Sequence, residues 1–358
     1  MPSLKEIKGR INSISSTLAI TSAMKMVAAA KLQKAQMAIQ NMLPYERRLH
    51  SMLIDLMGAM NISAAASEDG SVRGSGSAER GFDQSGDRLS LSNRHDLAGM
   101  DGAYSLMAQR EVRKVAIVAF ASNSSLCGAF NSNVIREATA VINEYRASGL
   151  GDADITVYSV GRKMAEAMKK LGFPSPADFT KMSDSPSYDA ASALAQELLD
   201  GFVSGRFDKV ELVYNHYKST SSQPTTRQTY LPLSLADATA DLQAGKIADS
   251  ASESDTNRGA EPVGAPVVRQ GSPTTEDLIV EPSKEALIAT LLPKVIRLRI
   301  FTTLLDSTAA EQAARTVAMQ LATDNGNDLL QELTLEYNKG RQQKITSEIL
   351  DLVGGSMQ

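Results

Sequence analysis

The chain has 358 residues, of which 42% are hydrophobic and 5% aromatic, so it can form two globular domains of ordinary apolar content. The net charge of −4 argues against a general nucleic-acid binder, and the single cysteine, Cys127, excludes an internal disulfide and fits a reducing compartment. No apolar run approaches the roughly 20 residues of a membrane span, and the first residues, MPSLKEIKGR, lack a signal-peptide core; we therefore expect a soluble chain on the cytoplasmic side, without a direct membrane span.

The first segment, residues 1–62, carries the pattern of a coiled-coil helix. Ser3 and Glu6 form a capping box, which predicts the start of the helix. Apolar residues then recur at alternating steps of four and three, with Lys25 and Glu46 as charged exceptions. The members of this N-terminal seam are Ile7, Ile11, Ile14, Leu18, Thr21, Lys25, Ala28, Leu32, Ala35, Ile39, Met42, Leu49, Leu53, Leu56 and Met60.

The last segment, residues 282–358, predicts a second, longer helix, interrupted only at Pro293. Its heptad seam is small or polar in the middle, so it buries little apolar area and needs a partner helix. The members of this C-terminal seam are Val295, Leu298, Thr302, Leu305, Ala309, Gln312, Thr316, Met319, Thr323, Gly326, Leu330, Leu333 and Tyr337.

Two long seams at opposite ends of one chain most simply pair as an antiparallel intramolecular coiled coil. A parallel homodimer is the alternative. In the antiparallel arrangement we expect Ile7 near Leu333 and Leu53 near Leu287, so that the numbers of facing residues add up to about 340. The helix would then lose its partner beyond Tyr337.

The middle of the chain, residues 104–235, alternates strands and helices. We expect strands at 115–121, 155–160, 210–214 and 225–233, and helices at 131–147, 162–171 and 188–203. The last strand would return along the edge of the sheet. An apolar helix stripe of Val134, Ala138, Val141, Ile142 and Tyr145 should pack on it. The sequence thus predicts an α/β protein: a long antiparallel coiled coil of the N- and C-terminal helices plus a small Rossmann-like α/β domain.

Two stretches, residues 63–103 and 236–281, are rich in Ser, Gly and Asp and hold few large apolar residues. Neither can bury a core, so both are predicted to be low-complexity inserts.

The middle domain offers little chemistry. The loop at 122–131 follows a strand and precedes a helix, where doubly wound folds bind phosphates, but it holds one glycine, Gly128, and no Gly-Lys-Ser/Thr. No histidine is close to Cys127 in sequence, which makes buried packing its expected role. We expect no catalytic residue, no cofactor and no metal.

The stretch 18–30, LAITSAMKMVAAA, is apolar or small on every face, so a two-helix contact alone cannot cover it. Residues 1–45 also carry an excess of basic side chains over a single acid, Glu6. This excess fits either a solvated face or docking with an acidic partner.

Three motifs resemble the γ subunit of F-type ATP synthases of the bacterial type. They are ITSAMKMVAAAKL at 20–32, LCGAFN at 126–131, and the C-terminal pair EQAARTVAMQLATDN and LTLEYNKGRQQKITSEILDLVGG. The resemblance implies a central rotor shaft that couples transmembrane proton flow to ATP synthesis and hydrolysis, without an active site of its own. It implies as partners a ring of three α and three β subunits, an epsilon subunit and a membrane c-ring, and a peripheral location on the cytoplasmic face of the inner membrane.

The same resemblance suggests contact residues. Arg341 and Gln342 match family positions that meet a polar loop of a β subunit, and Met24 and Lys25 would run past the β subunits lower on the shaft. Ile345, Ile349 and Leu352 form an apolar stripe that should pack against the ring. The chain departs from the family in the loop before Leu126, where Asn123, Ser124 and Ser125 replace a usual Asp and basic residue. Both inserts lack cysteine, which excludes the thiol regulation of photosynthetic relatives.

Two other classes of function remain as alternatives. One is a nucleotide-dependent enzyme with coiled-coil arms, and the other is a coiled-coil adaptor that does not rotate.

Overall fold

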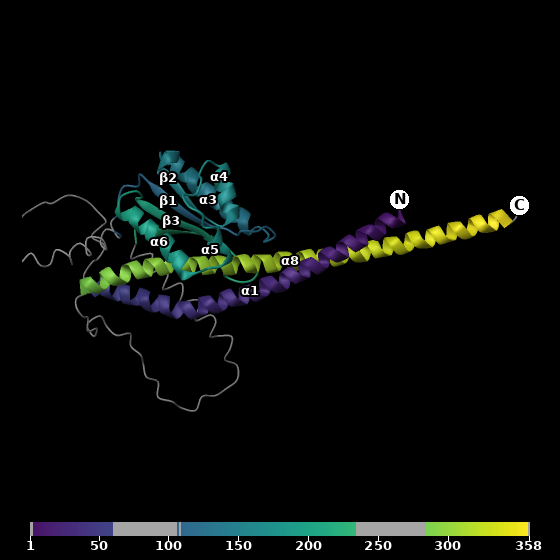
Figure 1. Cartoon of the computed structure of the whole chain (residues 1–358), viewed down its shortest axis with the longest axis horizontal. Coiled ribbons are helices and arrows are strands. Elements are labelled where there is room, and N and C mark those ends of the chain that lie inside the picture. Colours follow the sequence, from purple (N-terminus) through teal and green to yellow (C-terminus); the bar gives the residue numbers. More distant parts are fainter. Residues whose placement is uncertain (1–2, 60–105, 107–108, 234–283, 357–358) are drawn as a thin grey trace, which may run out of the picture.

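The computed structural model describes residues 3–59, 106, 109–233 and 284–356. The inserts expected at 63–103 and 236–281 lie outside these residues, so the division of the chain into domains stays a prediction. The described residues form two long helices and one α/β domain that sits on one half of them (Figure 1).

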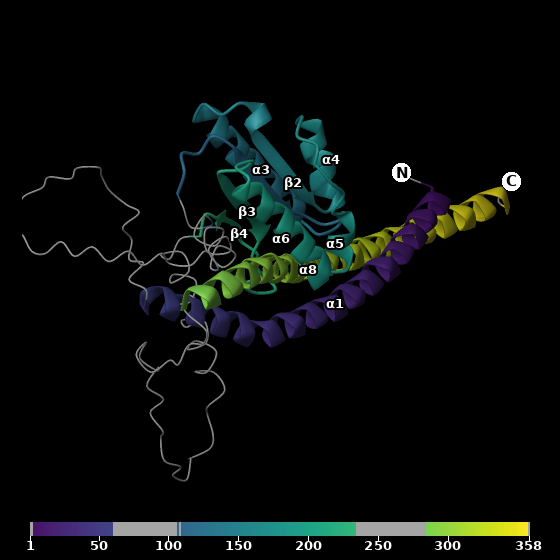
Figure 2. The same ribbon diagram turned by 60° about the vertical axis from the view of Figure 1, so that its left-hand side comes forward.

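Helix α1 (Leu4–Ala59) and helix α8 (Lys284–Ser356) run antiparallel, side by side, within one chain (Figures 1 and 2). Half of the predicted capping box is present: the backbone N–H of Glu6 donates to Ser3 Oγ at 3.2 Å, while Glu6 Oε1 accepts from Arg10 Nη2 at 2.9 Å. The 73 residues of α8 correspond to a rod of roughly 110 Å. The antiparallel intramolecular pairing is confirmed, and the parallel homodimer is not needed to cover either seam.

Neither helix is interrupted at its proline. Pro44 lies inside α1 and Pro293 inside α8, so the predicted interruption at Pro293 is wrong. Leu292 and Val295, on either side of Pro293, are buried in the core of the α/β domain. This packing holds the turn in helical form despite the missing backbone donor of the proline.

Every described member of the two predicted seams is buried or half-buried. In the projecting half of the coiled coil, the register of α1 against α8 differs from the prediction by about one helical turn. The numbers of facing residues add up to 344, not 340, where Leu18 meets Gly326 and where the Thr323 hydroxyl donates to Thr21 Oγ1. Ile7 accordingly lines a groove with Glu336 and Gly340 and not with Leu333, which lines another groove with Ile14.

The sheet has the order β2-β1-β3-β4. Strand β1 (Val115–Phe120) pairs in parallel with β2 (Ile155–Val160) and with β3 (Lys209–Asn215), and β4 (Thr225–Leu231) is an antiparallel edge strand. All four strands were predicted within two residues of their observed ends.

Helices cover both faces of this sheet (Figures 1 and 2). On the face away from the coiled coil lie α3 (Phe130–Ala147) and α4 (Arg162–Lys170), and the predicted apolar stripe of α3 is buried there with Val115 and Ile117. On the other face lie α5 (Thr180–Asp184), α6 (Tyr188–Val203) and the first half of α8. A 3-10 turn, η2 (Asp152–Asp154), leads into β2.

Helix α8 is therefore part of the core of the α/β domain. Its Ile288, Leu292 and Ile296 are buried in one cluster with sheet residues, and the hydroxyl of Tyr230 on β4 donates to the Ile296 carbonyl at 2.9 Å. The second half of α8 leaves the domain and projects, so that the C-terminus lies beyond the N-terminus (Figure 1).

Candidate functional site

The projecting half of the coiled coil is the first candidate site. From Leu321 to Leu350, no residue of α8 is buried. Large apolar side chains nevertheless occur along it, including Leu321, Leu329 and Leu335, which are 58%, 50% and 68% exposed. Together with the exposed apolar side chains of the tip, these leucines make the projecting half a candidate surface for contact with another protein.

The same holds on α1 for residues 18–30. Ile20, Met26 and Val27 are exposed, and only Ala28 of this stretch is buried. A contact with α8 alone leaves this stretch open on its outer faces, as the sequence indicated. Met24 and Lys25 are half-buried beside the seam.

The tip is the part of α8 that extends past the first residue of α1, Leu4. Leu4 lies against Gly340, so the helix keeps its partner about one turn farther than Tyr337, the residue we expected. Beyond that contact Arg341 and Gln342 are exposed, and so are Ile345, Ile349 and Leu352. The structure adds Leu350 and Val353, which sequence reasoning missed and which are also exposed. At 1.5 Å per residue, the tip lies roughly 30 Å from the level of Met24 and Lys25, so the two proposed contact pairs are separate.

The loop at 122–131 is the second candidate site, because it lies at the carboxyl end of β1, next to the point where the strand order reverses. Doubly wound folds hold ligands in that crevice. Here α8 crosses it. Cys127 and Phe130 of the loop are buried against Ala310 of α8, so the predicted packing role of Cys127 is confirmed.

An arginine of α8 enters this loop. Arg315 donates from Nη1 to the Ser125 carbonyl and from Nη2 to Ser124 Oγ, both at 2.8 Å, and its Nη2 lies 2.6 Å from Glu311 Oε1. Both charged side chains are 9% exposed. Burial raises the pKa of the Glu311 carboxyl, against the opposing influence of Arg315. The loop therefore holds a cation of its own chain, where related folds hold a phosphate.

Sequence reasoning missed this pair. Glu311 and Arg315 occupy positions i and i+4 of a helix, a spacing that signals an ion pair but not its burial. Leu126, which follows Ser125 in this loop, has a positive φ of 69° and is 56% exposed, so its side chain points outward while that of Phe130 is buried.

The third candidate site is the corner after β3, formed by His216 and Tyr217, which contacts both long helices. Asp306 of α8 accepts from the backbone N–H of Tyr217 at 2.9 Å and lies 2.6 Å from Nδ1 of His216. Gln36 of α1 donates to the Tyr217 hydroxyl at 2.7 Å.

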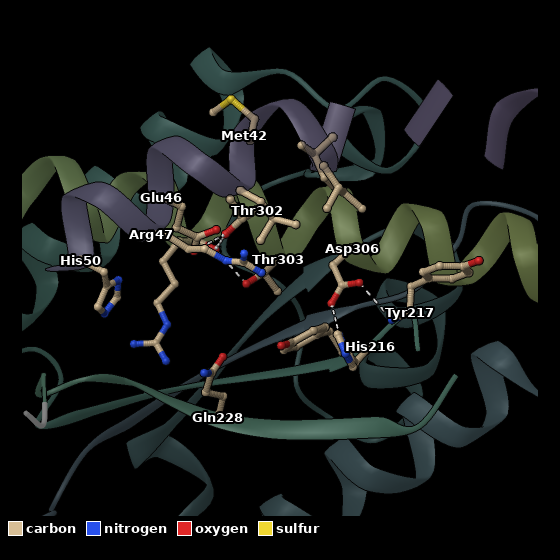
Figure 3. Close-up of a pocket in the computed structure, with 15 residues that line it drawn as sticks. Met42, Glu46, Arg47, His50, His216, Tyr217, Gln228, Thr302, Thr303 and Asp306 are labelled. Carbon is tan, nitrogen blue, oxygen red and sulfur yellow. Dashed lines mark hydrogen bonds and ion pairs between the residues drawn. The ribbon is translucent and has the colours of Figure 1, made fainter. Parts of the chain in front are cut away.

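A cavity of about 420 Å³ lies beside this corner, between α1, α8 and the two last strands (Figure 3). Arg47 and His50 extend into it from α1, and Gln228 faces them from β4. The cavity and the corner thus lie at the interface between the α/β domain and the coiled coil.

Within the described ranges, no group of three or more His, Cys, Asp or Glu side chains could hold a metal ion. In the same part of the chain, no helix is both long enough and apolar enough to cross a membrane.

The sequence matches the protein family described as ATP synthase over residues 3–357. It is 47% identical to the ATP synthase gamma chain of Phocaeicola vulgatus over 357 residues, and 45% identical to that of Bacteroides thetaiotaomicron over 358; each alignment covers 100% of both chains. The gamma chain of Flavobacterium psychrophilum is 35% identical, with 99% of this chain and 98% of that chain covered.

Among solved structures, a chain of the Euglena gracilis mitochondrial ATP synthase, in a structure of OSCP, F1 and the c-ring, superposes with a TM-score of 0.52 at 19% identity. The alignment covers 99% of this chain and 93% of that one, which supports the same fold. The full-length matches at 45–47% identity carry the assignment: this chain belongs to the gamma-chain family of ATP synthases.

Proposed function

We propose that this chain is the central rotor shaft of an F-type ATP synthase, and that it couples proton flow across the membrane to ATP synthesis and hydrolysis. The observation that carries the proposal is the projecting half of the coiled coil, where apolar side chains are exposed on α1 and α8 alike. A ring of three α and three β subunits around this half would cover those side chains.

An asymmetric rod inside a threefold ring touches each β subunit differently. A protein shifts the conformation of a partner only through such differential contact, so turning the rod changes the three sites in sequence. Each charge that crosses the membrane supplies about 2.3 kcal/mol per 100 mV, so several must be summed through one stiff element. The unbroken helix α8 suits that task.

Contacts with the ring fall at two levels in this proposal. Arg341 and Gln342 form an orientation-dependent catch on a β subunit near the tip. A planar guanidinium can hold a carboxylate through two parallel hydrogen bonds. Met24 and Lys25 contact the β subunits at a lower level of the shaft. Ile345, Ile349 and Leu352 pack against the inside of the ring of α and β subunits.

The opposite end, with the α/β domain, would face the epsilon subunit and the membrane c-ring. The chain is a peripheral part of a membrane complex, and we place it on the cytoplasmic face. It carries no active site of its own in this proposal. The occupation of the crevice at residues 122–131 by Arg315 argues against a nucleotide site there, and so against the alternative of an enzyme with coiled-coil arms.

The test is purification of the native complex through an affinity tag on a β subunit. The chain should co-purify in a ratio of one to three β subunits, and ATP hydrolysis should turn a bead attached to its α/β domain. Co-purification without rotation would favour the static adaptor. Saturable nucleotide binding by the isolated chain would favour the enzyme.

A further inference from the structure

The corner that follows β3 ties the α/β domain to both long helices at once. The Asp306 carboxylate of α8 receives the Tyr217 backbone N–H on Oδ1 and the His216 ring on Oδ2. The Tyr217 side chain reaches α1 through Gln36 and packs against two buried clusters, one with Leu32 and one with Cys127. Two consecutive residues thus contact α1, α8 and the loop at 122–131.

The strength of this contact depends on the charge of His216. A protonated imidazole carries a positive charge and two N–H donors, whereas the neutral ring has one donor and no charge. The charged ring adds to the hydrogen bond an electrostatic attraction to the Asp306 carboxylate, which the neutral ring lacks. Loss of the proton therefore weakens the bond to Asp306 without removing it.

Several charged or titratable groups surround the pair. Lys218 follows on the same corner, Glu46, Arg47 and His50 line the adjoining cavity from α1, and Arg299 lines it from α8. The hydrogen bond to Asp306 raises the pKa of His216 above its usual value, against the opposing influences of burial and Lys218. His216 therefore keeps its proton to a higher pH than an unperturbed histidine does.

We propose that His216 and Asp306 form a pH-dependent lock, which fastens the α/β domain to α8 most firmly when His216 is protonated. A histidine with a raised pKa in the folded chain contributes stability that is fully present below about pH 6.5. That contribution is lost as the pH rises through the raised pKa. The His216 side chain is 51% exposed, so the change loosens the corner locally and does not unfold the domain.

The lock is a property of this chain alone. It can be tested on the purified full-length protein, and its failure would leave the proposed rotor function untouched. In a rotor, the strength of the contact between the α/β domain and α8 would therefore depend on the pH of the surrounding compartment.

Hydrogen exchange resolved to single amides reads the lock directly, because the Tyr217 amide is one of its bonds. Between about pH 5.5 and about pH 8.5, and after correction for intrinsic exchange, protection of this amide should fall about threefold, the size expected when a half-exposed ion pair loses one charge. The Lys114 amide is the matched reference, since it also donates to an aspartate, Asp208 Oδ2 at 2.9 Å. The His216 amide, bonded to the Pro224 carbonyl at 2.9 Å, reports opening of the hairpin itself. Neither of these two should change.

Two variants separate charge from hydrogen bonding. His216→Arg keeps a positive charge at all these pH values, so protection of the Tyr217 amide should stay high. His216→Gln keeps a donor without charge, so protection should be low throughout. The proposal is overturned if the wild-type Tyr217 amide changes no more than that of Lys114, or if His216→Gln keeps the wild-type pH dependence. If a variant fails to fold, the wild-type titration with its reference amides still decides.

Discussion

Leu18 of α1 lies over Gly326 of α8 so closely that a Cβ added at Gly326 would stand 2.6 Å from Leu18 Cδ2. A leucine on one helix thus fills the space that glycine leaves on the other. This contact fixes the register of the two helices along the projecting half, and Gly340 repeats it against Leu4 at the tip.

Gly326→Val should therefore destabilise the coiled coil by about 1–3 kcal/mol, because the larger side chain cannot share this space with Leu18. The comparison is Gly340→Ala at a less crowded position, where the added Cβ would lie 3.1 Å from Leu4 Cδ2. There the better helix propensity of alanine, about 1 kcal/mol, should prevail. Thermal unfolding followed by circular dichroism measures both. Equal shifts in the two variants would show that close approach does not select glycine at 326.

Arg315→Ala should destabilise the chain by about 3–5 kcal/mol, because it leaves the carboxylate of Glu311 buried without its cation. The side chains of both residues are 9% exposed, so water cannot readily replace the lost partner. Urea unfolding of the purified chain gives the number. The double variant Glu311→Gln with Arg315→Met should recover much of the loss, and a double variant as unstable as Arg315→Ala would contradict this explanation.

Arg341→Ala with Gln342→Leu should lower ATP turnover of the assembled complex at least about tenfold, equivalent to roughly 1.4 kcal/mol of transition-state stabilisation. The physical reason is the loss of an orientation-dependent contact with a β subunit. Lys344→Gln is the control, since that side chain is 66% exposed and pairs weakly with Glu348 at 3.7 Å. Normal turnover in the double variant, with normal assembly, would show that Arg341 and Gln342 are only solvated surface residues.

Glu211 of β3 should make the α/β domain sensitive to acid. Burial favours a raised pKa, but hydrogen bonds from Arg227, Lys209 and Tyr145 outweigh it and leave the pKa of Glu211 lowered. A lowered carboxyl pKa contributes stability that is present above about pH 4.5 and lost as the pH falls through the folded value. Glu211→Gln should thus be less stable than the wild type at neutral pH and lose less on acidification.

Urea unfolding between about pH 3 and about pH 7 checks this prediction. Glu166→Gln is the control, because Glu166 is 52% exposed and its ion pairs lie on the surface. A wild-type curve that stays flat across this range would count against the role of Glu211.

The sequence was sufficient for the four strands, for the longer helices and for the pairing of α1 with α8, but not for the short helix α5. Strands such as residues 155–160 stand out by composition, and the seams beginning at Ile7 and Val295 are long enough to define two partners. The register was about one turn off because a heptad seam offers nearly equal apolar contacts after a shift of three or four residues. The close contact of Leu18 with Gly326 selects one register, and no local sequence pattern predicts that contact.

The junctions could not be predicted for a related reason. Asp306 and His216 are far apart in sequence, and so are Arg315 and Ser124, and each pair meets only after α8 has packed on the sheet. Helical spacing made the Glu311–Arg315 pair visible in principle, but not its burial in the loop.

The use of one helix for both the core and the projecting rod has a consequence for folding during synthesis. α1 leaves the ribosome first and its partner α8 last, so the seam from Ile7 to Leu56 stays uncovered while the intervening chain is made. The face of the sheet around Leu212 and Tyr230 waits for the same helix. A nascent chain stalled before residue 284 would expose both surfaces, which makes it a natural substrate for chaperones and a source of aggregates when translation fails.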